Sequence, residues 1–377
     1  KPKRLPRKKQ ENKFGFVGME MRKKFDEIFE DCTKLGTKIK TDEYHSNGKH
    51  PIIDQGQEMV AGFTDLEDGL LDAVPAIVFG DHTRIIKYVD CPFFLGADGV
   101  KVLRSKVPNA NYRYLYYALK NAKIPNTGYN RHYKWLKELE IEYPPIDQQL
   151  KTVKVLDKVE SIIYNRQNQL QKLDELVKAR FVEMFGGIHD SSLYPYVPVK
   201  ELTHVISGGT PSRDVLEYWC DGTIPWVKTT ELQNKIITEV DEHITSKGLA
   251  ASSAKIVPPN TTLIAMYGQG KTRGMTGYLG ISASTNQACA CILPSPEINS
   301  VYIWKYFELS YDKLRNMAKG GNQPNLNGNM IKNFPVLVPP IKRQEEYVQF
   351  VNQVDKSKAV EGLLFVVVPI GIIYKPI

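Results

Sequence analysis

The residues best suited to chemistry form a glycine-rich stretch, Gly268-Gln269-Gly270-Lys271-Thr272. Its ending is typical of phosphate-binding loops, in which backbone N–H groups surround a phosphate and Lys neutralises it. The full spacing requires glycine at position 265, where this chain has Ala265, and a helix afterwards, where it has Arg273-Gly274. We therefore do not predict nucleotide hydrolysis. Two interpretations stay open: a plain glycine-rich hairpin, or a loop whose backbone approaches a ligand while Lys271 and Arg273 donate to phosphate or guanine edges.

Other catalytic signals are weak. The segment Tyr143-Pro144-Pro145-Ile146 faintly matches the Asn/Asp-Pro-Pro-aromatic motif of amino-methyltransferases, but it lacks the acceptor and the aromatic residue that such chemistry needs. A Pro-Pro entry to a helix is the simpler interpretation. Cys289 and Cys291 would share one face of a strand, yet no further metal ligands are spaced beside them. The sequence predicts no catalytic, cofactor or metal site in this chain.

Several polar and aromatic loops are better suited to recognition. The segment 224–230 places an aromatic residue beside Lys and hydroxyl groups, and 322–327 is a run of amides, which suit bidentate pairing to adenine. In the first half of the chain, 80–84 and 129–134 have a similar character. The alternative for each loop is an ordinary surface turn. The functional interpretation therefore depends on the set of loops together.

The elements that must position these loops are duplicated. Tyr143–Gln149 and Val338–Gln344 lie 195 positions apart, and each opens a helical segment with Pro-Pro-Ile and Gln. Apolar positions keep the same register afterwards, as in Leu156 and Val351. One copy follows each of two globular-sized blocks, which indicates one module used twice.

The first helical segment, 148–185, has the period of a coiled-coil seam. It contains no glycine or proline, and Gly186-Gly187 ends it. A helix of this length would span about 57 Å and suits a rigid spacer. The seam consists of Leu156, Val159, Ile163, Leu170, Leu173, Val177 and Met184. The second segment follows the same pattern from Arg343 to about Val360 and is then cut short by an apolar tail.

The expected fold class is α+β, with two strand-rich domains separated by long helices that pair as an antiparallel coiled coil. Each strand-rich block carries one late helical segment, 112–122 and 301–318. The expected organisation is a basic tail over 1–24, a first recognition domain over 25–147, a spacer helix over 148–187, a second recognition domain over 188–341, and a shortened helix with an apolar tail over 342–377.

The net charge of +8 does not by itself indicate nucleic-acid binding. Residues 1–24 hold ten basic and two acidic residues, so the remaining 40 basic and 40 acidic residues balance. Any nucleic-acid surface must come from patterning within this neutral body. We expect the tail to be disordered or non-native, with Met21 as a plausible natural start. The five cysteines, without a leader or a membrane-length apolar segment, predict reduced, buried thiols and a cytoplasmic protein.

The combined pattern resembles the specificity (S) subunits of type I restriction-modification enzymes. The resemblance covers about 25–360 and includes Gly208-Gly209-Thr210-Pro211, Ile224-Pro225-Trp226, 268–274, Gln287-Ala288 and 321–326. It implies a non-catalytic reader of a bipartite, asymmetric DNA site. Implied DNA contacts in the second domain are Thr210, Trp226, Lys228, Thr229, Gly268, Gln269, Gly270, Lys271, Thr272, Arg273, Asn322, Gln323 and Asn325. Those in the first domain are Gly80, Asp81, His82, Thr83, Arg84, Asn130, Arg131, His132 and Lys134.

The resemblance also implies partners. Two methyltransferase (M) subunits would dock on the helices and carry S-adenosylmethionine for adenine methylation, and restriction (R) subunits would use ATP and Mg²⁺. The shortened second helix departs from the family pattern. We expect it to leave Leu170, Leu173 and Val177 partly uncovered, which would weaken M-subunit docking or favour pairing of two S chains. The alternatives are a self-pairing or silent DNA-binding scaffold and a stand-alone methyltransferase or nuclease.

Overall fold

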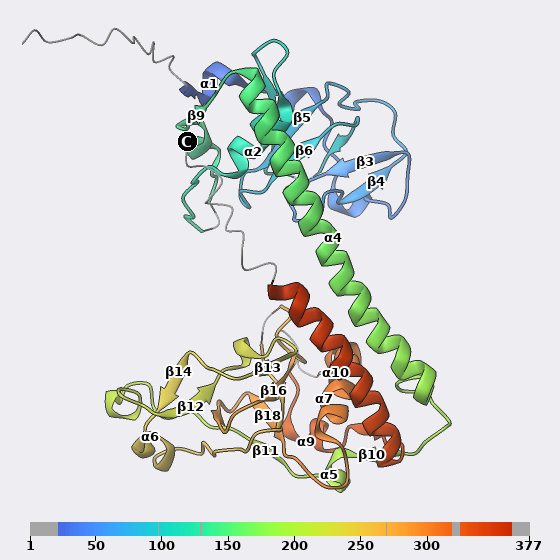
Figure 1. Ribbon diagram of the computed structural model, residues 1–377. Helices are drawn as coiled ribbons and strands as arrows, with labels where there is room; N and C mark the ends of the chain where they lie inside the picture. Colours follow the sequence, from blue (N-terminus) through green and yellow to red (C-terminus); the bar gives the residue numbers. More distant parts are fainter. Residues whose placement is uncertain (1–21, 97, 129, 269, 319–324, 364–377) are drawn as a thin grey trace, which may run out of the picture. The chain divides into compact units, whose positions relative to one another are not determined.

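The computed structural model describes residues 22–96, 98–128, 130–268, 270–318 and 325–363 (Figure 1). The chain divides into two compact units, Lys1–Tyr164 and Asn165–Ile377, and the boundary lies within helix α4 (Ile146–Phe185). This helix confirms the predicted spacer segment. Among the described residues, no helix is both long and apolar enough to cross a membrane.

The first unit is built on a four-stranded sheet of order β2-β8-β5-β6 and a three-stranded sheet of order β4-β3-β7, and β1 pairs with β9. Strand β5 is buried along its whole length, since it lies between β6 and β8 in the sheet and α2 packs against it. The elements are β1 Arg22–Lys24, α1 Phe25–Ile28, β2 Phe29–Asp31, β3 His50–Ile53, β4 Gly62–Thr64, β5 Ala76–Gly80, β6 Ile86–Val89, β7 Phe94–Leu95, β8 Val100–Ser105, α2 Tyr112–Lys120, α3 Tyr133–Lys137 and β9 Glu140–Glu142.

The second unit has a five-stranded sheet of order β11-β18-β15-β16-β13 and a three-stranded sheet of order β14-β12-β17, and β10 pairs with β19. The elements are β10 Tyr196–Pro198, α5 Val199–Leu202, β11 Val205–Ser207, β12 Ile224–Val227, β13 Lys235–Ile237, β14 Glu242–Ile244, α6 Ser246–Ala250, β15 Thr262–Ala265, β16 Thr276–Leu279, β17 Ser284–Thr285, β18 Cys289–Ile292, α7 Ser300–Leu309, α8 Tyr311–Met317, α9 Gly328–Lys332, β19 Pro335–Leu337 and α10 Ile341–Leu363.

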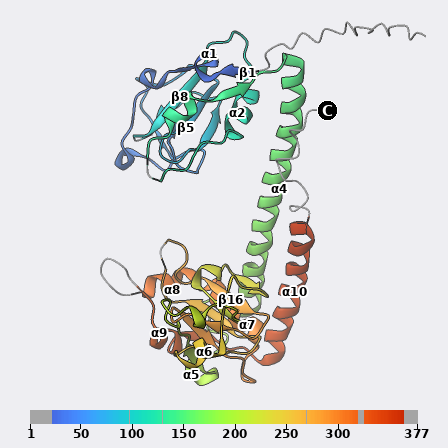
Figure 2. The same ribbon diagram turned by 90° about the vertical axis from the view of Figure 1, so that its left-hand side faces the viewer.

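Helix α10 runs antiparallel to the C-terminal part of α4 within the second unit (Figures 1 and 2). The Tyr347 hydroxyl on α10 donates to the carbonyl of Val177 on α4. Further along α10, Lys358 forms an ion pair with Asp174 of α4. Phe181 packs edge-on against Tyr347 at a ring-centroid distance of 5.5 Å. This pairing confirms the expected antiparallel helix arrangement.

The same pairing corrects part of the prediction about uncovered seam residues. Val177 is only 6% exposed, and Leu173 packs against the core of the second unit. Leu170 is half-buried. In an antiparallel pair the beginning of α10 covers the C-terminal part of α4, so this coverage does not depend on how the second helix ends. The expected exposure at Val177 is therefore wrong.

The internal duplication extends to individual hydrogen bonds. Gln149 Nε2 donates to the carbonyl of Pro144 at 2.8 Å, and Gln344 Nε2 donates to that of Pro339 at 2.7 Å. Both glutamines are buried at the start of their helices. The repeated Pro-Pro-Ile-x-x-Gln sequence therefore encodes one helix entry twice.

The two late helices are equally alike. Asn111 accepts from the backbone of α2, and Asn299 accepts from that of α7, so each helix begins with an asparagine cap. Tyr114 then donates to the carbonyl of Glu142, and Tyr302 to that of Leu337, at 3.0 and 2.8 Å. These carbonyls lie on β9 and β19, which directly precede the long helices.

Three further predictions are corrected in detail. Residues 22–24, assigned to the tail, form strand β1 and pair with β9. The predicted helix over 301–318 is two helices, because Ser310 interrupts it and bonds its hydroxyl to the carbonyl of Tyr306. The thiols of Cys91 and Cys220 are exposed, whereas those of the other three cysteines are buried as expected.

Candidate nucleic-acid interface

The glycine-rich loop of the second unit connects β15 to β16, so it is followed by a strand and not by a helix. Gly270 and Gly274 have φ angles of 57° and 85°, which favour glycine. The Tyr311 hydroxyl donates to the carbonyl of Lys271 at 2.7 Å, and Arg315 donates to that of Gly270 at 2.8 Å. Helix α8 therefore holds the loop by its carbonyls.

This geometry presents the side chains of the loop unequally. Lys271 is exposed, while Thr272 and Arg273 are half-buried. Gly268 has a φ of 148° and is half-buried, and Gln269 lies outside the described residues. Among its described residues, the loop thus offers one exposed cation, Lys271, on a frame held by α8, which fits contact with a charged ligand better than nucleotide hydrolysis.

The segment around Trp226 serves mainly as structure. Trp226 is 2% exposed, and its indole Nε1 donates to the carbonyl of Gly209 at 2.9 Å. Arg213 stacks on Trp219, with its guanidinium carbon 3.6 Å from the ring centroid. Because a buried indole has no surface for a base, we remove Trp226 from the predicted DNA contacts.

Lys228 is already neutralised by acidic neighbours. Its Nζ lies 2.9 Å from Glu242 and 3.4 Å from Asp241. The hydrogen bond that Lys228 donates to Glu242 raises the pKa of this lysine above its ordinary value. Thr229, half-buried, opens a short 3-10 turn directly afterwards. Lys228 is therefore a weaker candidate for phosphate contact than Lys271.

The Gly208-Gly209-Thr210 motif makes a close backbone crossing. A Cβ on Gly209 would lie 2.3 Å from the backbone nitrogen of Ala254. Thr210 hydrogen-bonds the side-chain oxygen of Gln287, a residue that had carried the resemblance but had no assigned role. The amide of Gln287 is exposed beside this bond. The structure therefore brings two motifs 77 positions apart to one surface.

The amide run is only partly described. Asn322 and Gln323 lie outside the described residues, and Asn325 is half-buried. The backbone N–H of Leu326 donates to the carbonyl of Met266, which immediately precedes the glycine-rich loop region. Asn327 caps α9 by accepting from Met330. The run therefore continues beside the glycine-rich loop.

In the first unit, the two predicted loops touch each other. The backbone and the ring Nδ1 of His132 both contact the carbonyl of Asp81, at 2.8 and 2.9 Å. The carboxylate of Asp81 accepts from the backbone of Tyr133 at 2.7 Å. Asp81 and His132 are buried. Since both residues are buried and bonded to each other's loop, we remove them from the predicted DNA contacts.

The remaining residues of these loops surround that junction. His82 and Arg84 are half-buried, Gly80 is buried, and Thr83 is exposed with its hydroxyl bonded to the carbonyl of Gln55 at 2.7 Å. The Gln55 side chain also accepts from the backbone of His82. Exposed residues on the second loop are Asn130, Arg131 and Lys134. Gln55, which the sequence analysis did not single out, thus organises the first loop.

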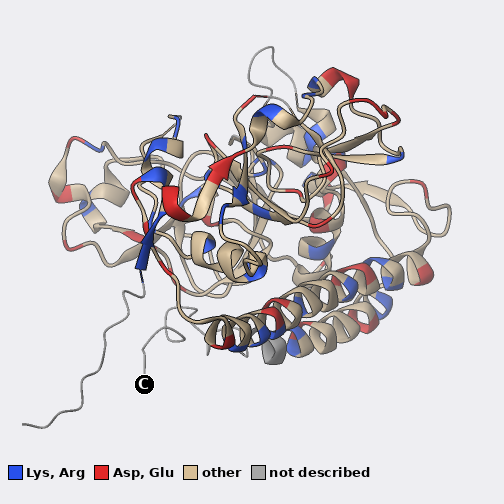
Figure 3. Ribbon diagram, turned by 90° about the horizontal axis from the view of Figure 1, so that it is seen from above, with Lys and Arg blue, Asp and Glu red and all other residues tan. Residues whose placement is uncertain are grey.

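The seam residues of α4 divide into two degrees of burial. Buried positions are Leu156, Val177 and Met184. Half-buried positions are Val159, Ile163, Leu170 and Leu173. Basic and acidic residues are interspersed along α4 and α10 (Figure 3), so these helices carry no block of a single charge.

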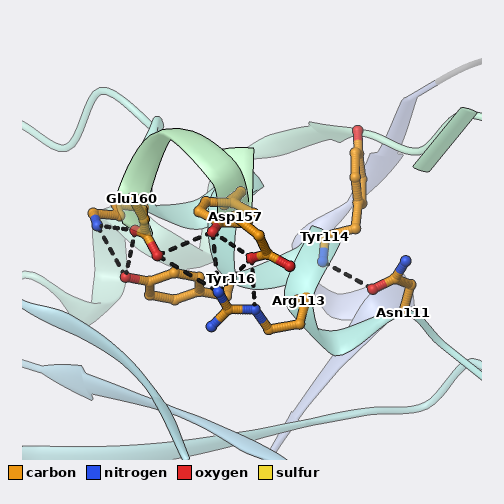
Figure 4. A network of polar contacts seen from close by, with 8 residues as sticks. Asn111, Arg113, Tyr114, Tyr116, Asp157 and Glu160 are labelled. Carbon is orange, nitrogen blue, oxygen red and sulfur yellow. Dashed lines mark hydrogen bonds and ion pairs between the residues drawn. The ribbon is translucent and has the colours of Figure 1, made fainter. Parts of the chain in front are cut away.

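A polar network that sequence reasoning missed joins α2 to α4 in the first unit (Figure 4). Tyr117 donates to Asp157 at 2.6 Å, and Lys120 pairs with Glu160 at 2.7 Å. Arg113 hydrogen-bonds Asp157 and lies over the ring of Tyr88 on β6 at 4.8 Å. The spacing of Arg113, Tyr117 and Lys120 on one helix face could have signalled this network.

Burial alone would raise the pKa values of the two carboxyl groups in the network. Hydrogen bonds from Tyr117 and Arg113 reverse this for Asp157, and those from Lys120 do so for Glu160, so both pKa values lie below the ordinary range. Burial and the same carboxylates raise the pKa of Tyr117 strongly. The network is therefore charged on α4 and holds its tyrosine protonated.

A metal or redox centre finds no support in the described part of the chain. No group of three or more His, Cys, Asp or Glu side chains there could hold a metal ion. Burial raises the pKa of Cys291 to about 11 and that of Cys289 well above its ordinary value. These thiols on β18 are core residues.

Comparison with known proteins gives a consistent family. The model of the type I restriction modification DNA specificity domain matches twice, over 18–175 and 193–362. The specificity subunit of the type I restriction enzyme EcoR124I/EcoR124II from Escherichia coli is 22% identical over 356 residues, which covers 89% of this chain and 86% of that protein. The specificity subunit of MjaIX from Methanocaldococcus jannaschii is 27% identical over 165 residues, covering 42% and 37%.

A solved structure supports the fold. The type I restriction-modification S subunit from M. genitalium has a TM-score of 0.51 at 16% identity and covers 91% of this chain and 93% of that one. The two domain matches occupy most of the chain and coincide with the duplicated helix entries and tyrosine bonds. The chain therefore belongs to the type I restriction-modification DNA specificity family and carries the domain of that family twice.

Proposed function

We propose that this chain reads a bipartite, asymmetric DNA site, with one recognition domain for each half-site. The main observation behind this proposal is that the specificity domain occurs twice in this chain. The two copies share even the hydrogen bonds that Gln149 and Gln344 make at the start of the long helices. Each copy consists of a strand-rich domain with its own loops, followed by one long helix. Two similar frames with different loops fit two different half-sites held at a fixed spacing.

The DNA contacts that we propose are those whose side chains or backbone remain accessible. In the second domain they include Lys271 as the main cation, with Arg273 and the Thr210–Gln287 pair nearby. In the first domain they include Thr83, Arg131 and Lys134. Cations position the backbone of DNA, while amides and hydroxyl groups read base edges.

Partner subunits carry the chemistry in this proposal. Two M subunits would supply S-adenosylmethionine and methylate adenine, and R subunits would supply ATP- and Mg²⁺-dependent cleavage in the cytoplasm. Val155 and Ile162 are 49% and 51% exposed and lie one heptad apart on α4. Exposed apolar residues at this spacing suit contact with a partner protein. This chain would act without catalysing a reaction itself.

A matched pair of lysine variants tests the DNA-reading role. Lys271→Gln removes an exposed cation, whereas Lys228→Gln removes one that Glu242 already neutralises. In the complex with M subunits, we expect Lys271→Gln to weaken DNA binding about fivefold and Lys228→Gln to change it less than twofold. Equal and negligible effects of both variants, or no DNA binding by the wild-type complex, would contradict the proposal.

Self-pairing is the second candidate, and the exposed pair Val155 and Ile162 favours it as well. Sedimentation of the purified chain separates the candidates. A monomer that becomes larger only with M subunits supports docking of M subunits. A dimer that Val155→Ser and Ile162→Ser together dissolve would instead support pairing of two S chains.

A further inference from the structure

The second unit contains a polar cleft of about 420 Å³ that the predicted loops do not account for. One wall is the edge strand β11, and the other is the start of α9. A Cβ on Gly328 would lie 3.9 Å from Ser207 Oγ, so the walls approach each other there. The cleft is lined by Val205, Ile206, Ser207, Lys255, Asn327, Gly328, Asn329 and Lys332.

The lining of the cleft is cationic. It contains two lysines, Lys255 and Lys332, and no acidic residue. Both lysines are exposed, and neither forms an ion pair with any residue in the described ranges. By contrast, Lys228 and Arg213 in the same unit share Glu242. Two unneutralised cations around a polar hollow favour an anionic ligand.

The cleft adjoins the motifs that define the family resemblance. Strand β11 leads directly into Gly208-Gly209, and Gly209 packs against Ser253 and Ala254, which precede Lys255. On the other wall, Asn327 follows Leu326, whose backbone bonds to Met266 beside the glycine-rich loop. A ligand that lies across those loops would therefore also pass the cleft.

We propose that this cleft receives a phosphate of the DNA backbone, with Lys255 and Lys332 donating to its oxygen atoms. This inference rests on the proposed function and adds a sequence-independent anchor to it. Ser207 and Asn329 supply neutral donors at the same place. Because phosphate contacts fix register but carry no base information, the anchor would set the position of the second domain on its half-site.

The test uses variants that remove the charge and keep a polar side chain. Lys255→Gln and Lys332→Gln are combined, and Lys235→Gln serves as a control because Lys235 is exposed on β13, at the opposite edge of the same sheet. DNA affinity of the complex with M subunits is measured from low to high salt. Each lost phosphate contact reduces the magnitude of the negative slope of log K against log salt by about 0.9.

We expect the double variant to reduce the magnitude of the slope by about 0.9, as for one lost phosphate contact, and to weaken binding about tenfold at moderate salt, with the recognised bases unchanged. The control should keep the wild-type slope. A double variant that keeps this slope while Lys271→Gln still weakens binding would overturn the cleft and leave the DNA-reading role intact. Saturable binding of inorganic phosphate with an unchanged DNA slope would also overturn it, since the cleft would then be an anion site away from DNA.

Discussion

The two copies of the domain attach the same late helix to the long helix in different ways. In the first copy, Tyr117 on α2 bonds to Asp157 and Glu160 on α4. In the second, the equivalent helix α7 places Lys305 against Asp355 on α10, at 3.7 Å. The caps and the tyrosine bonds to β9 and β19 are shared. Duplication has thus kept the backbone frame and changed the side chains that hold it.

The second copy adds an aromatic core that the first lacks at this place in the described residues. Phe181 and Phe185 from α4 pack on Tyr302, Tyr306 and Tyr347, with ring centroids 5.5–6.1 Å apart. Helix α10 supplies Tyr347. We infer that the second copy depends chiefly on apolar packing and that the first depends more on charge, which gives the two copies different sensitivities.

The largest expected effect is on the aromatic core. Phe181→Ala should destabilise the second unit by about 3–5 kcal/mol, because it removes a fully buried ring and leaves a cavity. Hydrogen exchange of peptides from α7 and α10 measures this effect. The control is Val182→Ala at an exposed neighbouring position, with an expected change below about 0.5 kcal/mol. Similar effects of both variants would contradict the packing account.

The next largest effect is expected at the starts of the two long helices, where the equivalent glutamines should contribute unequally to stability. Gln344 donates to Pro339 and also accepts from the backbone of Asn299 at 2.9 Å. Gln344→Ala should therefore cost about 2–3 kcal/mol, and Gln149→Ala about 1 kcal/mol, since it breaks the bond to Pro144. Hydrogen exchange at each long helix, measured during chemical denaturation, compares the two variants. A larger loss for Gln149→Ala would reverse the inferred order.

The tyrosine network should give a smaller loss in the first unit. Tyr117→Phe removes the hydroxyl that bonds Asp157 and Glu160, with an expected cost of about 1–2 kcal/mol. Tyr112→Phe is a control in the same helix that removes one bond, to the backbone of Ser105. Exchange of α2 peptides reports both. If Tyr117→Phe lowers the stability of α2 no more than Tyr112→Phe does, the network contributes little to stability.

Acid should affect the two copies in opposite directions. The lowered pKa values of Asp157 and Glu160 give stability that is present above their ordinary values of 3.8 and 4.5 and lost as pH falls through the folded values. Burial raises the pKa of Glu308, so its contribution instead improves as pH falls from the folded toward the ordinary value. Exchange near pH 7 and pH 3 should show α2 weakening relative to α7, and Asp157→Asn with Glu160→Gln should remove the weakening of α2.

The sequence predicted the frame well because the frame is local. Heptad spacing defined α4, and the Pro-Pro-Ile-x-x-Gln repeat located both helix entries. Strand pairings such as β1 with β9 join residues more than 100 positions apart, so no local pattern announces them. The break at Ser310 was missed because neither glycine nor proline marks it.

The candidate site was predicted less completely, since residue type does not reveal burial. Trp226 and His132 look like recognition residues, but their polar atoms are used inside the fold. Gln287 and Gln55 gained roles only through contacts with distant loops. Lys228 illustrates the same point, because its neutralising partner Glu242 lies on β14, 14 positions further along the chain.

The most direct test of the central claim is adenine methylation mapping of DNA exposed to the wild-type chain and to Lys271→Gln, each in complex with M subunits. The account predicts a two-part motif for the wild type, and for the variant a loss of methylation that follows the half-site read by the second domain. An uninterrupted motif, or methylation that is independent of this chain, would contradict the account.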